Sequence, residues 1–257
     1  MMSSDNPVLW EELTWEEIPN ALAAAGHAVL LPCGATEQHG PQLGTGVDTS
    51  IAEAVCLGVS ACTRVPVLPA LAFGCSLGHS QRWPGTISLT PQTLIAMVTD
   101  IGDWLVASGV RRLFLINAHV TNFAPLRCAL EVLRAKHDGL MVALIPTAEI
   151  SPRVREACFA DADDWHANAA ETSLLLAIRP ELVRPEKLSE ADDPDRTAGL
   201  QFAHPVNRTS RNGVTGFPSR ATTDDGGRIF SWMVEDLSAR VRAGLNEAPP
   251  LPHLWKP

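Results

Sequence analysis

The sequence predicts an α/β fold, a three-layer α/β/α sandwich with a mainly parallel central sheet. Short apolar runs alternate along the chain with longer amphipathic stretches, the pattern of strands separated by helices. Strands connected in this way pair in parallel through right-handed crossovers. A chain of 257 residues with 46% hydrophobic and 19% charged residues can bury one large core. We therefore expect a single domain over residues 1–257.

The apolar runs are bounded by Gly, Pro or Asn, which is typical of buried strands. In chain order, the predicted strands are 27–34, 65–73, 111–118 and 140–146. The predicted helices are 50–62, 91–109, 121–139, 170–178 and 226–245. The helix from Pro91 has proline near its start and Gly109 just past its end, the expected asymmetry. The segment 181–225 is long and irregular, so we expect it to line the site or to form an oligomer contact.

Composition excludes several classes of partner. Lys plus Arg number 20 against 29 Asp plus Glu, a formal net charge of −9, so nucleic acids and anionic membranes would be repelled. The six cysteines form no CxxC pair, which favours free thiols in a reducing compartment. No signal-peptide pattern is present, and no apolar run approaches the ~18 residues of a membrane span. We expect a cytoplasmic protein.

Potential metal ligands follow the predicted strands. In open parallel sheets, ligands bind beyond the carboxyl ends of the strands. The candidates at these ends are Glu37, His39, Asp48, His119, His166 and Glu171. Imidazole and carboxylate suit Zn, Mn or Fe, and a carboxylate such as Asp48 can bridge two ions about 3.5–4 Å apart. The sequence therefore predicts a site for one or two divalent metal ions per chain.

These residues lie in motifs that resemble the creatininase family. Thr36-Glu37-Gln38-His39-Gly40-Pro41, followed by Asp48-Thr49, is similar to the family signature. Later blocks match in order, at 83–89, 117–122, 166–173 and 213–221. The resemblance covers residues 27 to about 240, nearly the whole chain.

The resemblance implies a creatininase-like hydrolase of C–N bonds in small cyclic or linear amides, outside peptides, that is often hexameric. Glu37, Asp48 and His119 would hold one metal, and His39 with bridging Asp48 would hold the second. Creatininase itself completes the second site with a glutamate at the position of Thr121. Either Glu171 supplies the missing carboxylate here, or the second metal is weakly bound or absent.

The same resemblance assigns catalytic roles. His166 matches the family's proton-transfer histidine, which would pass a proton to the leaving nitrogen, and Glu171 is a further catalytic candidate. Val120 and Thr121 depart from the family enzyme, so we expect a substrate other than creatinine. The residues expected to bind a small-molecule amide substrate are Ser76, His79, Trp83, Val120, Thr121 and Trp165.

Two alternatives remain. Residues 74–78, Gly-Cys-Ser-Leu-Gly, match the G-x-S-x-G elbow of serine hydrolases, with Asp164 and His166 following in the required order. The residues after Gly78 do not read as the helix that such an elbow needs, and this alternative gives the candidate metal ligands no role. The chain could also be a non-catalytic scaffold of the same fold.

Overall fold

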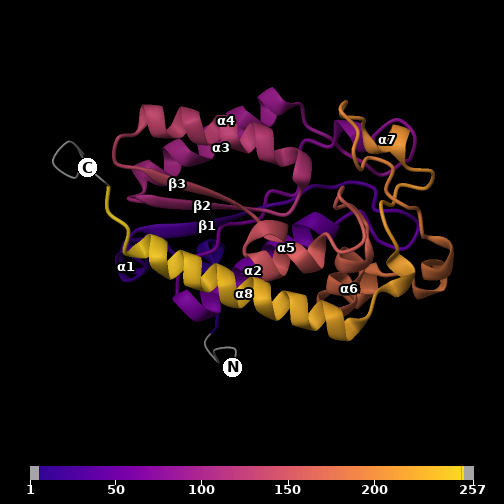
Figure 1. Ribbon diagram of the computed structural model, residues 1–257. Coiled ribbons are helices and arrows are strands. Elements are labelled where there is room, and N and C mark those ends of the chain that lie inside the picture. Colours follow the sequence, from indigo (N-terminus) through magenta and orange to yellow (C-terminus); the bar gives the residue numbers. More distant parts are fainter. Residues whose placement is uncertain (1–5, 250, 252–257) are drawn as a thin grey trace.

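The computed structural model describes residues 6–249 and 251, and its core is a parallel three-stranded sheet (Figure 1). The strands are β1 (Ala28–Cys33), β2 (Arg112–Asn117) and β3 (Met141–Pro146), in the spatial order β1-β2-β3. β1 and β2 end at the same level, since Cys33 pairs with Asn117. Side chains that follow these two strands are therefore neighbours at the carboxyl edge of the sheet.

Helices connect the strands and flank the sheet. Their bounds are α1 (Ile18–Ala24), α2 (Val47–Thr63), α3 (Pro91–Ala107), α4 (Phe123–Lys136), α5 (Pro152–Cys158), α6 (Ala169–Ile178), α7 (Val206–Thr209) and α8 (Thr223–Leu245). Three short 3-10 turns lie near the carboxyl edge: η2 (Leu77–His79), η3 (Val120–Asn122) and η4 (Thr147–Glu149). No described helix is both long and apolar enough to span a bilayer.

The two faces of the sheet carry separate apolar cores. Alternate strand residues point to opposite faces, so Leu30 and Phe114 pack with α2, α5, α6 and α8. Leu31 and Leu115 pack instead with α3 and α4. Figure 1 shows α3 and α4 on one side of the strands and α2 and α8 on the other. The predicted α/β/α sandwich is confirmed.

The prediction of a regular strand over 65–73 is wrong. This segment pairs in parallel beside β1 only through isolated bridges, Leu30 with Val67 and Cys33 with Leu71. Pro66 and Pro69 lack an N–H and cannot donate to a ladder. The bonds that remain use other groups, such as the Pro66 carbonyl, which accepts from the Leu30 N–H at 2.9 Å. The segment thus extends the sheet as an irregular edge.

Helix boundaries differ from the predictions by a few residues. α2 begins at 47 instead of 50 and α8 at 223 instead of 226, and α4 covers 123–136 because the turn η3 precedes it. Thr222 caps α8 by accepting a hydrogen bond from the Asp225 N–H.

The segment 181–225 contains short turns and is tied to the rest of the fold by bridges. Val183 pairs with Leu43, and Thr215 pairs with His166. Within the segment, the Asp193 carboxylate accepts from the Arg196 guanidinium, the Ser210 hydroxyl and the Arg211 N–H. The segment therefore reaches the candidate site through Thr215, and its role in an oligomer contact stays a prediction.

Candidate metal centre

The loop after β1 places two candidate ligands in a fully enclosed position. Glu37 and His39 are 0% and 1% exposed. The Glu37 N–H donates to the Thr45 carbonyl at 3.0 Å, and Thr36 pairs with Ile87, so the backbone between them is held extended. Asp48 lies in the first turn of α2, and one of its oxygens is 3.3 Å from Nε2 of His39.

His119 follows β2 and reaches the same group. The Asn117 amide donates to the His119 carbonyl at 2.7 Å and accepts from its N–H at 3.2 Å, which fixes the backbone at the end of the strand. Nε2 of His119 is 3.3 Å from Glu37 Oε2, and Nδ1 is 3.5 Å from Asp48 Oδ2. The Thr121 hydroxyl is 2.6 Å from the same Nε2.

The turn before α6 brings in His166 and Glu171. Ala167 has a φ of +52°, a left-handed conformation that turns the chain between His166 and the helix. Asn168 caps α6 by accepting from the Glu171 N–H at 3.1 Å. Nδ1 of His166 lies 3.4 Å from Glu37 Oε1, and Glu171 Oε1 lies 3.8 Å from Nε2 of His39.

Burial shifts the charge state of this cluster. Burial and the Asp48 carboxylate raise the pKa of Glu37 well above its ordinary value. Burial opposes a charge on His39, but the neighbouring carboxylates, chiefly Asp48, outweigh it and raise the pKa of that imidazole. Burial lowers the pKa of His79 to about 3 and that of His166 well below its usual range. Metal ligands must be deprotonated, so an ion bound here would displace the protons that these shifts favour on Glu37 and His39.

The donor set fits divalent metal. Two groups of possible ligand atoms, each within 4.8 Å of one another, share Asp48: Glu37 with His119, and His39 with Glu171. Four buried atoms of these residues have no hydrogen-bond partner in the described chain: Glu37 Oε1 and Oε2, His39 Nε2 and Asp48 Oδ2. Such atoms are costly unless something binds them. All six predicted ligand candidates thus lie together, and Glu171 is near His39 as a replacement ligand would be.

Residues 11–241 match the family described as creatininase, creatinine amidohydrolase. The chain belongs to the creatininase family. It is 34% identical over 236 residues to the mycofactocin precursor peptide peptidase of Mycobacterium tuberculosis H37Rv, covering 86% of each chain. It is 31% identical over 256 residues to the creatinine amidohydrolase of Pseudomonas putida, covering 93% of this chain and 96% of that one.

Solved structures of creatininase have the same fold. The crystal structure of creatinine amidohydrolase superposes with a TM-score of 0.81 at 31% identity, over 94% of this chain and 99% of that one. A manganese form and a variant described as Zn-Zn type each give a TM-score of 0.81 at 30% identity. The family resemblance expected from the motifs is therefore confirmed, and this chain is a creatininase-family hydrolase.

Sequence reasoning missed one polar residue of this creatininase-family site. Gln38 sits between two candidate ligands, and strand alternation would point it away from them. Its amide instead lies 3.0 Å from Nε2 of His166 and donates to the Gly213 carbonyl at 3.2 Å. Because an amide N–H₂ only donates, Nε2 of His166 accepts, which leaves the ring proton on Nδ1, facing Glu37. The sequence signal for this contact is the place of Gln38 in the motif, between Glu37 and His39.

The expected substrate-binding residues divide into three groups. His79, Val120, Thr121 and Trp165 line the pocket over the ligand cluster. Ser76 is fully buried beneath it, with its hydroxyl 3.2 Å from Nε2 of His119. Trp83 lines a separate hollow, which Gln38 and His39 also line. Their roles toward a substrate stay predictions.

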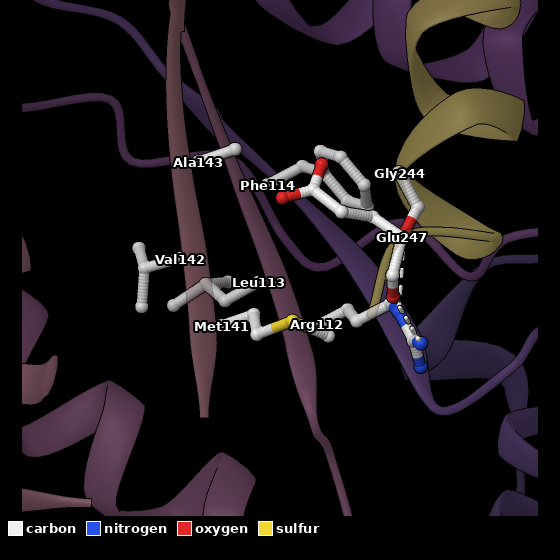
Figure 2. Close-up of a pocket in the computed structure, with 8 residues that line it drawn as sticks. All are labelled: Arg112, Leu113, Phe114, Met141, Val142, Ala143, Gly244 and Glu247. Atoms are coloured by element: carbon white, nitrogen blue, oxygen red, sulfur yellow. Dashed lines mark hydrogen bonds between the residues drawn. The ribbon is translucent and has the colours of Figure 1, made fainter. Parts of the chain in front are cut away.

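Another hollow lies at the opposite, amino end of β2 and β3 (Figure 2). It is lined by Arg112, Met141 and the end of α8, and Figure 2 shows Arg112 beside Gly244 and Glu247. The Arg112 guanidinium donates to the carbonyls of Gly244 and Glu247, both at 3.2 Å. The guanidinium thus ties α8 to the sheet, and no group of metal-binding side chains was found here among the described residues.

Proposed function

We propose that this chain is a metal-dependent amidohydrolase that cleaves a C–N bond in a small cyclic or linear amide. One observation carries the proposal: three carboxylates and three imidazoles converge in a buried pocket, and four of their polar atoms have no hydrogen-bond partner among the described residues. The named relatives include an amidohydrolase and a peptidase, both of which are names for enzymes that hydrolyse amide bonds. We propose one or two ions of Zn, Mn or Fe per chain.

Each ligand group has a natural place in this proposal. Glu37, Asp48 and His119 would hold one ion, and His39, Asp48 and Glu171 would hold the other. Bound metal would lower the pKa of water toward about 7 and polarise the substrate carbonyl. Oε2 of Glu171, the oxygen that does not face His39, accepts a hydrogen bond from the Ala167 N–H. Glu171 therefore also orients the turn that carries His166.

His166 is proposed to move the proton. It is 5% exposed, and burial keeps the imidazole neutral, with its ring proton on Nδ1, from which it can be donated. The Gln38 amide holds the opposite nitrogen, so Nδ1 stays directed toward Glu37 and the pocket. From there His166 can deliver the proton to the leaving nitrogen as the C–N bond breaks.

The substrate is proposed to differ from creatinine. Val120 lies at the pocket where the family enzyme has an aromatic residue, and it is 50% exposed. Thr121 contacts His119 and the Cys75 carbonyl, so it offers a hydroxyl instead of a carboxylate. On the family resemblance, we also propose a cytoplasmic homohexamer, which light scattering of the purified protein would test for assembly.

Metal content and activity of three variants test the proposal. Asp48→Ala and His119→Ala should lose both bound metal and amide hydrolysis, whereas His166→Ala should keep the metal and lose hydrolysis. His137→Ala is a matched control, because His137 pairs with Asp103 at the end of α4, outside the pocket. Equal metal content and activity in all of these proteins would reject the assignment.

A serine hydrolase is the second candidate, because the structure gives Ser76 a partner histidine. Its hydroxyl is 3.2 Å from Nε2 of His119, whose Nδ1 is 3.5 Å from Asp48. The partners are therefore not the expected Asp164 and His166. Ser76 has no exposed surface, and its chain continues into the short turn η2 instead of a long helix. The metal-dependent mechanism also gives Glu37, His39 and Glu171 a role as ligands, whereas a serine hydrolase would not use them.

A further inference from the structure

The open edge of the sheet is made only of apolar residues. β3 pairs with β2 on one side, and no described segment pairs with it on the other. Residues 140–146, Leu-Met-Val-Ala-Leu-Ile-Pro, contain no charged or polar side chain. Most residues of β3 are only partly buried, although the strands of parallel sheets are normally covered. β3 is thus an apolar strand that the described chain covers incompletely.

Backbone groups of β3 point out from this edge without partners. The Met141 N–H donates to the Arg111 carbonyl at 2.9 Å, so the peptide group of Met141 faces β2. Peptide groups alternate in direction along a strand, and those of Val142 and Leu144 therefore face outward. No hydrogen bond within the described chain uses their N–H groups or carbonyls. The edge offers these free donors and acceptors to another strand.

The opposite edge of the sheet is protected against pairing, whereas the β3 edge is not. Beside β1, Pro66 and Pro69 remove N–H donors from the segment 65–73, and proline is a usual device against pairing at an edge. β3 contains no charged residue, and its one proline is the last residue, Pro146. Soluble proteins rarely leave such an edge free, because it pairs with other chains. The contrast between the two edges indicates that β3 has a regular partner strand.

The backbone of β3 matches a second copy of itself about a two-fold axis. In an antiparallel pair centred on Ala143, Val142 lies opposite Leu144 of the partner subunit, and each outward N–H meets a carbonyl. The next positions outward need no further acceptor. The Leu140 N–H already donates to a carbonyl of its own chain at 3.0 Å, and Pro146 has no N–H. This register therefore pairs every outward N–H of the strand.

The side chains favour the same register. Ala143 faces its own copy on the axis, in a non-hydrogen-bonded pair whose Cα atoms approach to about 4.5 Å, where a small side chain fits. Met141 lies beside Ile145 of the partner subunit, which makes an apolar cross-strand pair. Met141 and Ala143 also line the hollow at the amino end of the sheet (Figure 2), so this part of the strand is accessible.

We propose that β3 pairs antiparallel with β3 of a second copy of this chain, which joins the two sheets into one continuous sheet across a two-fold axis. The contact is isologous, because the same strand serves both subunits. It gives the assembly a specific interface, and it does not depend on the proposed amide hydrolysis.

Two substitutions of Val142 test the pairing, with the mass of the assembly measured by light scattering. Val142→Pro removes an outward N–H that makes no hydrogen bond within the described chain, and an edge strand tolerates proline at such a position. The wild type should contain an even number of subunits, and Val142→Pro should lower the mass about twofold, because a two-fold contact joins equal halves. Val142→Thr is the matched control. It keeps the N–H and the branched shape, so its mass should equal that of the wild type.

Cross-linking at the axis is a second test, which does not weaken the contact. Ala143→Cys brings two thiols together at about 4.5 Å between Cα atoms, within the range of roughly 4.4–6.8 Å that a disulfide needs. Oxidation with copper phenanthroline should therefore join two chains through this position, and mass spectrometry of the peptides identifies the bond. Ala135→Cys, on the exposed face of α4, is the control and should form no disulfide with its own copy.

Three results would overturn the inference: a monomeric wild type, an unchanged mass for a folded Val142→Pro protein, or no disulfide from Ala143→Cys. A monomeric wild type would favour a strand of a different protein as the occupant of the edge. If Val142→Pro loses the circular dichroism of the wild type, the cross-link alone decides. Hydrolysis is a separate result: its absence from a wild type that pairs through β3 would reject the proposed function and leave this contact in place.

Discussion

Gly226 lies where α8 touches α6, and replacing it tests how closely the two helices must approach. A Cβ at this position would lie 1.8 Å from the Ser173 carbonyl oxygen and 2.4 Å from its carbon. Real Cβ contacts essentially never fall below 3.0 Å, so the Gly226→Ala change must separate the backbones by more than an ångström. Both neighbours are backbone atoms, which no rotamer change can move aside.

The adjacent glycine is a matched control. A Cβ on Gly227 meets nothing within 4 Å, and both residues belong to the same helix. Gly227→Ala should therefore stabilise the protein by up to about 1 kcal/mol, the usual gain in helix propensity. Gly226→Ala receives the same gain but also the cost of overpacking, about 1–3 kcal/mol in ordinary cores and more against fixed backbone.

We expect the free energies of unfolding of the two variants to differ by about 3 kcal/mol or more, with Gly226→Ala the less stable. Urea denaturation followed by circular dichroism measures this difference. Because α6 carries Glu171, Gly226→Ala should also lower metal content, whereas Gly227→Ala should not. Indistinguishable stabilities would refute the close packing of α6 on α8.

Four further predictions follow from single features. Chelation should lower the melting temperature by several degrees and Zn or Mn should restore it, since a ligand at about 100 times its Kd adds about 2.7 kcal/mol; no change would contradict a buried metal. Ser76→Ala should reduce turnover only a few-fold, and complete loss with metal retained would favour the serine hydrolase. The Asp161 carboxylate accepts hydrogen bonds from the Asn168 amide and from the Phe217 N–H, both within 2.8 Å. Asp161→Asn should therefore lower the free energy of unfolding by about 1–3 kcal/mol, measured by urea denaturation. An unchanged urea midpoint would contradict this stabilising role. Hydrogen bonds from Arg153 lower the pKa of Asp236, so Asp236→Asn should destabilise at neutral pH, and the deficit should vanish as pH falls through the native pKa; a deficit independent of pH would contradict this.

The sheet and its main helices were predictable because each depends on a local pattern. β1, β2 and β3 are short apolar runs, and each lies within two residues of its predicted bounds. The segment 65–73 has the same composition, but Pro66 and Pro69 interrupt its hydrogen bonding. The two prolines that make the segment irregular are visible in the sequence, but its hydrophobic composition led to the prediction of a strand. Short helices such as α5 offered too few turns for a periodic signal.

The ligand cluster was predictable for a topological reason. Parallel strands deliver the residues that follow them to one edge, so spacing in the chain matters little. Trp83 shows the limit of that reasoning. Its loop is held by the Arg82 guanidinium, which donates to the Ser210 and Arg211 carbonyls, and this carries the indole toward a separate hollow. Hydrogen bonds between two irregular segments that lie far apart in the chain produce no periodic pattern in the sequence.

The distribution of the ligands along the chain has a consequence for biosynthesis. The candidate ligands come from four segments between residues 37 and 171, and α6, which carries the last of them, packs against α8. A ribosome releases these segments one after another, so a nascent chain offers at most fragments of the coordination shell until α8 has emerged. On the proposed metal chemistry, loading would be a late event, and a partly synthesised chain would have little means of retaining an ion.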